Sequence, residues 1–188
     1  MNSTLHAKAC ATGLALAAVL VSCREAPLER APAKVDAAPV ALAEMVTVME
    51  FGADGRALGL ESMAKIVLPD EEWRRRMTPL GYAVTRHRET ELAFTGKYDK
   101  HHASGSYRCA ACNLALFSSE TKFDSGTGWP SFWAPIAAEN VYNAGDGGRD
   151  EVLCKRCDAH LGHVFADSPE PTGLRYCMNS AALAFSGN

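Results

Sequence analysis

The sequence lacks an apolar run long enough to cross a bilayer. The run from Ala9 to Val21 is shorter than the roughly 18 residues that a membrane-spanning helix requires. An excess of charge of one sign is also missing, because 19 basic and 22 acidic residues give a net charge of −3. We see no internal repeat and no heptad pattern. These features exclude a transmembrane span and argue against nucleic acid or anionic lipid as a partner.

The N-terminal residues 1–22 have the pattern of a secretion signal. A short polar start containing Lys8 precedes the apolar run, which ends in "LVSC" at Cys23. A small residue directly before a cysteine at this place resembles the processing box of bacterial lipoproteins, in which the cysteine becomes the lipidated first residue. We therefore expect lipidation at Cys23 and export to the bacterial cell envelope, on the periplasmic side. An ordinary cleaved signal and a buried core helix are the alternatives.

Residues 23–44 are rich in alanine and proline, and their prolines break any helix. We expect an extended tether that lets the following domain work away from the membrane surface. Membrane association is expected through the lipid anchor only.

The chain after this tether predicts a mainly β fold. In residues 45–69, two strand-like runs flank an Asp-Gly turn, which predicts a β-hairpin extension. In residues 70–188, short apolar runs are separated by recurring turn residues, and no helix longer than about three turns is supported. This pattern is typical of a mostly antiparallel β domain with peripheral short helices.

One of these helices is predicted directly after the hairpin. It runs through "EEWRRRM", with Asp70 as the expected N-cap. Thr78-Pro79 and Gly81 are expected to end it.

Four cysteines form two C-x-x-C pairs, Cys109/Cys112 and Cys154/Cys157. Each pair can present two sulfurs in a tight turn, and two pairs complete a tetrahedral sulfur site. One structural Zn²⁺ per chain is the favoured interpretation, because four thiolates leave the metal no open position for catalysis. Two disulfides in an oxidising compartment and an iron–sulfur cluster are the alternatives.

Two histidines follow the second pair in "CDAHLGHVF", and the four cysteines make them surplus as metal ligands. A regular strand would point His160 and His163 to opposite faces. Gly162 between them could mark a bulge that brings both rings to one side. There they would offer a nearby thiol a proton donor and acceptor. Core packing or exposure is the alternative for both rings.

Cys177 is a lone thiol in "TGLRYCMNS". In a strand it shares one face with Arg175 and Asn179. A fixed positive charge favours the thiolate, so we expect Arg175 to lower the pKa of the thiol, and the carboxamide could position a polar substrate. A buried cysteine that acts as a small apolar residue is the alternative.

The loop "FDSGTGWPSFW" carries glycines and a proline around Trp129. Such a rigid loop tipped by an aromatic ring can cradle a small alkyl group. Packing of Trp129 in the core is the alternative.

Three motifs, "SGTGWPSF", "CDAHLGHVF" and "TGLRYCMNS", together with the two C-x-x-C pairs, resemble peptide methionine-(R)-S-oxide reductase, the B type of methionine sulfoxide reductase. The resemblance runs from about Asp70 to Phe185 and includes "VTRHRETELAFTGKY". It implies two antiparallel β-sheets with a four-cysteine zinc site on the side away from the active site. It also implies reduction of the R epimer of methionine sulfoxide, free or in proteins. The 45–69 hairpin lies outside the resemblance and is assigned no role.

The resemblance also implies a role for each matching side chain. It implies that Cys177 is the nucleophile that attacks the sulfoxide sulfur and that His163 and His160 orient and protonate the departing oxygen. It places Asn179 and Arg175 at the polar ends of the site, with Asp167 as a support of the histidines. Trp129 and Phe132 are implied as the substrate cradle.

One position departs from the family pattern. Many members carry a resolving cysteine in the "SGxGWPSF" loop, where this chain has Thr127. Because the other cysteines are assigned to metal, leader or anchor, we expect the sulfenic acid on Cys177 to persist until an external thiol, such as a thioredoxin-like protein, attacks it. The expected partners are this reductant and oxidised proteins or peptides, and we expect a monomer.

Two functions of other classes use the same residues. A membrane-anchored, zinc-stabilised binding module without catalysis would hold a partner on the aromatic loop. A cysteine hydrolase would pair Cys177 with His163 as nucleophile and base.

Overall fold

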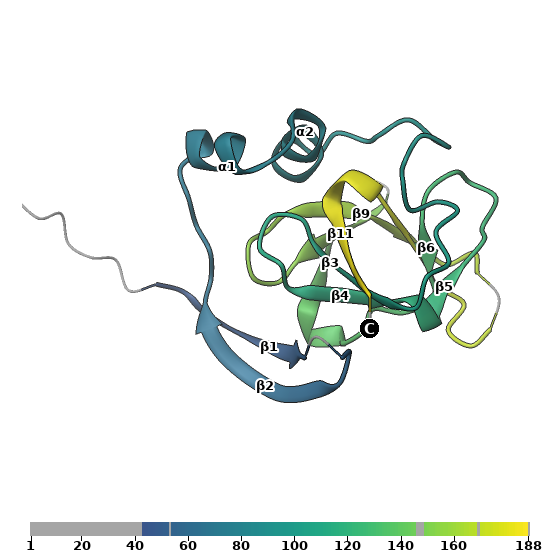
Figure 1. Cartoon of the computed structure of the whole chain (residues 1–188), viewed down its shortest axis with the longest axis horizontal. Coiled ribbons are helices and arrows are strands. Elements are labelled where there is room, and N and C mark those ends of the chain that lie inside the picture. Colours follow the sequence, from purple (N-terminus) through teal and green to yellow (C-terminus); the bar gives the residue numbers. More distant parts are fainter. Residues whose placement is uncertain (1–42, 53, 146–148, 169, 188) are drawn as a thin grey trace, which may run out of the picture. The chain divides into compact units, whose positions relative to one another are not determined.

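The computed structural model describes residues 43–187 except 53, 146–148 and 169 (Figure 1). The expected signal 1–22, lipidation at Cys23 and nearly all of the tether 23–44 lie outside the described residues and stay predictions. In the part of the chain that is described, no helix is both long and apolar enough to cross a membrane.

Short strands dominate the described chain, as the sequence predicts. The strands are β1 (Met45–Phe51), β2 (Ala57–Ala64), β3 (Gly105–Cys109), β4 (Ala115–Ser118), β5 (Lys122–Phe123), β6 (Ser131–Phe132), β7 (Val141–Gly145), β8 (Asp150–Cys154), β9 (His160–Phe165), β10 (Arg175–Met178) and β11 (Leu183–Gly187). The helices are α1 (Asp70–Arg76) and α2 (Pro79–His87), with short 3-10 turns η1 (Ser119–Thr121), η2 (Ala138–Asn140) and η3 (Ser180–Ala182).

Neighbouring strands pair in antiparallel fashion throughout the described residues. One sheet has the order β5-β6-β10-β9-β8-β7, a second has β11-β3-β4, and β1 with β2 forms a separate two-stranded sheet. The two larger sheets are the pair that the family resemblance implies, and the third is the predicted hairpin. The mainly antiparallel β class is therefore confirmed.

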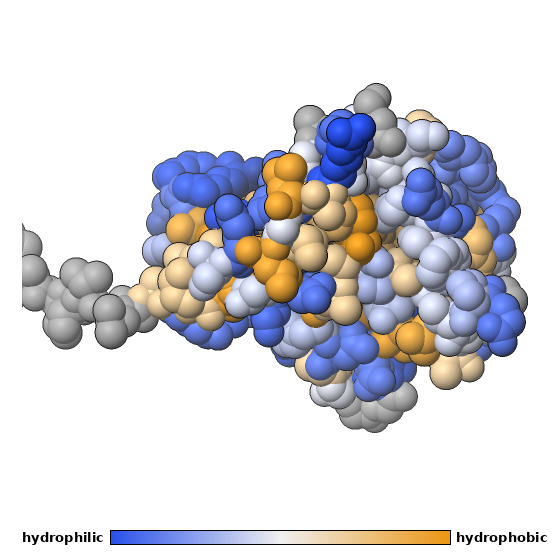
Figure 2. All heavy atoms as spheres, turned by 90° about the horizontal axis from the view of Figure 1, so that it is seen from below, coloured by the Kyte–Doolittle hydropathy of each residue, from blue (hydrophilic) through white to orange (hydrophobic). Residues whose placement is uncertain are grey.

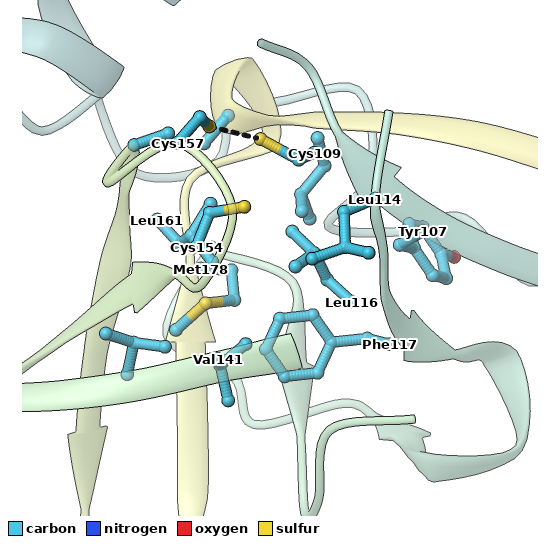
Figure 3. Close-up of a cluster of buried hydrophobic side chains, with 14 of the residues drawn as sticks. Tyr107, Cys109, Leu114, Leu116, Phe117, Val141, Cys154, Cys157, Leu161 and Met178 are labelled. Carbon is cyan, nitrogen blue, oxygen red and sulfur yellow. Dashed lines mark hydrogen bonds between the residues drawn. The ribbon is translucent and has the colours of Figure 1, made fainter. Parts of the chain in front are cut away.

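The core lies between the two larger sheets. Phe117 of β4 stacks on Phe132 of β6 with 4.5 Å between ring centroids, and Tyr107 of β3 meets Phe132 edge-on at 5.0 Å. Figure 3 shows this cluster continuing past Leu116 and Met178 to cysteine sulfurs at one end. Burial of each such side chain stabilises a fold by about 1.5–3 kcal/mol. The contact between the sheets is therefore a main source of stability.

Two helices occupy the region where the sequence predicts one. α1 has Pro69 as its N-cap and no side-chain capping bond, so the assignment of Asp70 as N-cap is wrong. The Thr78 hydroxyl accepts a hydrogen bond from the Gly81 amide at 3.0 Å, and Pro79 occupies the first turn of α2. These residues therefore begin a second helix, because a threonine cap followed by proline is a start signal as well as a break.

The β1–β2 hairpin is built into the domain. Val46 and Val48 of β1 are buried in the same apolar cluster as the sheets. The Asn140 side chain also accepts from the Met49 amide and donates to the Met49 carbonyl, each at 2.8 Å. The hairpin, to which the sequence assigned no role, thus contributes to the core. Seen from below (Figure 2), the described part of the face on which it lies carries small apolar spots divided by polar residues.

Candidate active site and metal centre

The four predicted metal ligands meet at one end of the core. The Sγ atoms all lie within 4.8 Å of one another, with 3.7 Å between Cys109 and Cys157 (dashed in Figure 3) and 3.5 Å between Cys112 and Cys154. A tetrahedral ion with metal–sulfur bonds of about 2.3 Å would set its sulfurs about 3.8 Å apart. A disulfide requires about 2.05 Å between sulfurs, and all four cysteines are free, so the structure contradicts the disulfide alternative. The residues fit a four-thiolate metal site.

Both C-x-x-C pairs use the same local turn. The Asn113 amide donates to the Cys109 carbonyl at 2.8 Å, and the Asp158 amide donates to the Cys154 carbonyl at 3.0 Å. Asn113 and Asp158 adopt φ values of 64° and 54°, in the left-handed region that these residue types tolerate. Because Cys109 ends β3 and Cys154 ends β8, an ion held here would join the two large sheets.

A small cavity opens beside the predicted nucleophile. Its volume is about 100 Å³, and it is lined by Thr90, Trp129, Arg149, Gly162, His163, Phe165, Cys177, Met178 and Asn179. A larger hollow of about 450 Å³ beside α2 is lined by none of the predicted site residues. The smaller cavity is the candidate active site, because it brings the lone thiol, an imidazole and the loop tryptophan together.

Strand β10 positions the thiol as its alternation predicts. Tyr176 and Met178 are buried in the core, whereas Arg175 and Cys177 are half-buried on the other face. Antiparallel pairing sets Cys177 opposite His163 of β9. The thiol and the imidazole therefore reach the cavity from neighbouring strands.

The loop before β6 brings hydroxyl groups to the thiol. Thr127 Oγ1 lies 3.9 Å from Cys177 Sγ. A chain of 2.8 Å contacts joins the Thr127, Ser125 and Ser131 hydroxyls. The side chain at the family's resolving position is thus in contact with the nucleophile.

Burial raises the pKa of the Cys177 thiol above its ordinary value. The Thr127 hydroxyl, the charge of Arg175 and the Ser131 hydroxyl lower it but do not offset burial. Arg175 does lower the pKa of the thiol, as expected. The overall pKa of Cys177 is nevertheless raised, so the expectation of a lowered pKa is wrong. Removal of the thiol from water outweighs a neighbouring cation that is itself paired with a carboxylate.

The bulge predicted at Gly162 is present in β9. The register against β8 shifts between His160 and Gly162, which leaves Leu161 as the extra residue. The rings of His160 and His163 consequently lie side by side, with 5.3 Å between their centroids. Of these two rings, that of His163 lines the cavity and that of His160 is buried.

Glu151 is a site residue that sequence reasoning missed. Its buried Oε1 lies 2.7 Å from His160 Nδ1 and 2.9 Å from Arg88 Nε. Burial lowers the pKa of His160, and the carboxylate of Glu151 opposes this effect. A neutral His160 would place its hydrogen on Nδ1, toward the carboxylate. Its Nε2 is buried without a hydrogen-bond partner among the described residues.

The sequence predicts Asp167 as a support of the histidines, whereas the structure pairs it with Arg175. Both Asp167 oxygens accept hydrogen bonds from Arg175, from Nε at 2.8 Å and from Nη2 at 2.7 Å. Arg175 holds the pKa of Asp167 below its ordinary value. The guanidinium also lies over the Phe165 ring, 4.4 Å from its centroid. Asp167 therefore orients Arg175, and Glu151 is the carboxylate that supports His160.

The two aromatic residues predicted for the substrate cradle, Trp129 and Phe132, lie in different places in the structure. Trp129 is half-buried at the cavity, and its Nε1 donates to the Glu91 carbonyl at 3.1 Å. Phe132 is fully buried in the core and does not line the cavity, so its assignment to the substrate cradle is wrong. Phe132 pairs with Tyr176, so both side chains point to the core face of the sheet. Cys177 is the next residue along β10 and points to the opposite face.

Asn179 lines the cavity, but its carboxamide is used within the protein. Its Nδ2 donates to the Leu161 carbonyl at 3.1 Å, and its Oδ1 accepts from the Glu91 amide at 3.0 Å. These bonds tie the residue after β10 to β9 and to the segment after α2, whose Glu91 carbonyl also accepts from the Trp129 indole. Asn179 therefore organises the wall of the cavity.

A lone thiol, an imidazole and a tryptophan surround a small cavity, apart from four clustered cysteines that could hold a metal ion. This arrangement defines a cysteine-dependent enzyme. The chain belongs to the SelR-domain family, whose domain matches residues 77–187. A peptide methionine sulfoxide reductase MsrB of Thiobacillus denitrificans is 56% identical over 120 residues, which cover 62% of this chain and 91% of that protein. An MsrB of Thioalkalivibrio sulfidiphilus is 53% identical over 122 residues, which cover 63% and 89%.

Proposed function

We propose that this chain reduces the R epimer of methionine sulfoxide to methionine, in oxidised proteins and peptides and as the free amino acid. The observation that carries the proposal is the position of Cys177 in a cavity with Trp129 and His163, within the SelR domain. A cavity of about 100 Å³ suits the methylsulfinyl end of a side chain.

In the proposed reaction, the Cys177 sulfur attacks the sulfoxide sulfur. The sulfur–oxygen bond of the substrate breaks as the oxygen passes to Cys177, and the products are methionine and a cysteine sulfenic acid. The substrate sulfur is reduced by two electrons and the cysteine sulfur is oxidised by two. Because the pKa of Cys177 is raised, most of the enzyme holds the thiol at neutral pH, and in the proposed step its proton passes by way of His163 to the transferred oxygen.

His163 is the group proposed to protonate the departing oxygen. It lines the cavity opposite Cys177, and the buried ring of His160 lies beside it. Glu151 holds the His160 ring through Nδ1 and is itself paired with Arg88. Arg175 stabilises charge at the thiol, and Trp129 receives the substrate methyl group.

The proposed resolution of the sulfenic acid uses an external reductant. Thr127 supplies no thiol at the family's resolving position, although its Oγ1 lies 3.9 Å from Cys177 Sγ. A thioredoxin-like protein would form a mixed disulfide with Cys177 and release water, and its second thiol would then free Cys177.

Zn²⁺ is the ion proposed for the four-cysteine site. Four thiolates in tetrahedral spacing suit zinc, and Cys109, Cys112, Cys154 and Cys157 would hold it. Bound there, the ion would supply cross-linking of the sheets and no catalysis. We also propose a lipid anchor at Cys23 on the periplasmic side of the cell envelope, which rests on the "LVSC" pattern.

Epimer specificity tests the function. Purified protein is incubated with the separate R and S epimers of N-acetyl-methionine sulfoxide and dithiothreitol, and N-acetyl-methionine is measured. We expect reduction of the R epimer only, with one dithiothreitol oxidised per product and no activity in Cys177→Ser. Equal rates for both epimers would contradict the proposal. Ester hydrolysis without reductant would indicate a cysteine hydrolase instead.

Trapping of the oxidised enzyme tests the resolution step. After one turnover without reductant, we expect a dimedone adduct on Cys177 and loss of one thiol per methionine, measured by mass spectrometry and thiol titration. Thr127→Cys is the control, because it should lose two thiols and form an internal disulfide without the adduct. Loss of two thiols in the unmodified chain would contradict the prediction.

A further inference from the structure

An exposed apolar surface borders the cavity. Leu92 and Phe94 are 77% and 66% exposed, while Thr90 and Trp129 line the cavity beside them. We call Leu92 and Phe94 the apolar rim. Scattered exposed apolar residues need no explanation, but two large ones next to a binding cavity indicate an interaction surface.

The apolar rim is fastened to the loop that carries Trp129. The Phe94 amide donates to the Gly128 carbonyl at 2.8 Å, and the Trp129 indole donates to the Glu91 carbonyl at 3.1 Å. A Cβ added to Gly128 would stand 2.8 Å from carbons of the Phe94 ring. The ring therefore lies directly on the residue before Trp129, so the rim and the cavity form one continuous surface.

The backbone of the apolar rim is held in an unusual conformation. Phe94 has φ 66°, in the left-handed region that bulky residues rarely adopt. The Leu92 carbonyl accepts hydrogen bonds from the Thr95 amide at 3.3 Å and the Thr95 hydroxyl at 2.7 Å, which close the turn. Such a conformation persists only where surrounding contacts enforce it, and it is frequent at binding sites. The exposure of the Phe94 ring is thus maintained by the fold.

The size of the cavity determines which part of a substrate meets the apolar rim. A cavity of roughly 150 Å³ holds one benzene molecule. The present cavity of about 100 Å³ can therefore accept the end of a single side chain and no neighbouring residue. Residues on either side of an oxidised methionine must lie outside it, where Leu92 and Phe94 offer apolar contact.

We infer that the apolar rim binds apolar side chains adjacent to the oxidised methionine of an unfolded polypeptide. This inference rests on the proposed reductase function and specifies its substrate class. Leucine, isoleucine, valine, phenylalanine and methionine side chains are most often buried in native proteins, so a site with apolar side chains on either side of a methionine is more accessible after unfolding. The free amino acid has no such neighbours and gains nothing from the rim.

Paired substrates test the inference on the full chain. Two synthetic peptides carry one methionine-R-sulfoxide flanked by leucines or by serines, and N-acetyl-methionine-R-sulfoxide is the third substrate. For the double variant Leu92→Ser, Phe94→Ser, we expect KM for the leucine peptide to rise about tenfold. KM for the other two substrates should stay within about twofold, with kcat unchanged. Leu58→Ser on β2, which replaces a residue 71% exposed, is the matched control and should change nothing.

Each other result has a defined meaning. Equal rises in KM for all three substrates would show that the rim shapes the cavity, and no change for any would show that it binds nothing; both overturn the inference. Self-association of the unmodified chain in ultracentrifugation that the double variant abolishes would assign the rim to a second copy and also overturn it. Failure of the unmodified chain to reduce any of the three substrates would instead refute the proposed function.

Discussion

At Cys177, two physical effects oppose each other on one thiol. Burial beside the core raises its pKa, whereas Arg175, Thr127 and Ser131 favour the thiolate. A reactive cysteine usually lies in an electropositive and partly exposed place, where the thiolate is stable. Here the protein keeps the thiol mostly protonated at rest. Its reactivity must therefore depend on deprotonation during attack.

Arg175→Gln tests the contribution of the cation. The unmodified thiol should be alkylated by iodoacetamide with a midpoint above that of a free cysteine, and the rate should rise with pH toward this raised pKa. Loss of the guanidinium removes an effect that lowers the pKa, so the midpoint should move higher. For every pH unit by which the midpoint rises, alkylation at neutral pH should slow about tenfold. The adduct on Cys177 is measured by peptide mass spectrometry against an Arg74→Gln control, and a lower midpoint would contradict the prediction.

Glu151→Gln tests the support of His160. The carboxylate raises the pKa of His160 against the effect of burial, so its removal should lower that pKa further. Titration of the His160 ring by NMR would measure the change. Activity should fall about tenfold or more, because the neutral amide holds the imidazole less firmly. Glu120→Gln is the surface control, and an unchanged His160 titration with full activity would contradict this role.

The residue roles could be predicted where a sequence motif lies on a strand, because the alternation of side chains then shows which residues share a face. The face shared by Arg175 and Cys177 follows from alternation alone, and Gly162 marks the bulge that joins the two histidines. Glu151 could not be found in this way, because no local motif includes it. Its contact with His160 depends on the register of β8 against β9.

At the scale of elements, the close approach of β9 and β10 fixes the geometry of the site. A Cβ on Gly162 would stand 2.1 Å from the Cys177 carbonyl oxygen and 2.9 Å from the Met178 Cα. These are backbone atoms, which cannot rotate aside. The glycine thus allows the strand that carries His163 to pair closely with the strand that carries Cys177.

Gly162→Ala should therefore separate the two strands. We expect a loss of about 2–3 kcal/mol in the free energy of unfolding, as for other overpacked sites, together with a large loss of activity. Denaturant unfolding and the reductase assay measure the two effects. Gly145→Ala is the control, because a Cβ there meets no atom within 4 Å. Full stability in Gly162→Ala would show that the strands can move apart without cost.

Element boundaries are harder to predict than element types. The hairpin and the short strands follow from turn residues and alternating patterns. From the sequence, Thr78-Pro79 is expected to end the first helix, whereas in the structure it begins α2. Signals that end a helix and signals that begin one use the same residue types. The error at Phe132 has a different reason. β6 has only two residues, which are too few to show an alternation of apolar and polar side chains. Its pairing with β10 therefore decides which side chain points to the core.

At the scale of the whole molecule, the proposed metal site lies where the two large sheets meet. The first cysteine pair begins at the last residue of β3 in the three-stranded sheet, and the second begins at the last residue of β8 in the six-stranded sheet. Their sulfurs close one end of the core that Phe117 and Phe132 fill. None of the four cysteines lines the catalytic cavity. A metal ion bound there would therefore influence catalysis by holding together the sheets that carry the site.

Loss of the metal should consequently unfold the domain, and not only slow the reduction of methionine sulfoxide. For Cys109→Ser we expect loss of the single bound zinc and a fall of more than about 4 kcal/mol in the free energy of unfolding, because zinc binding and folding are coupled in such sites. Metal content is measured by mass spectrometry of the ion, and stability by thermal unfolding. Cys177→Ser is the matched control, since it should abolish reductase activity while retaining one zinc and a melting temperature close to that of the unmodified chain. A Cys109→Ser protein that loses zinc but keeps its melting temperature would show that the sheets hold together through their apolar contact alone.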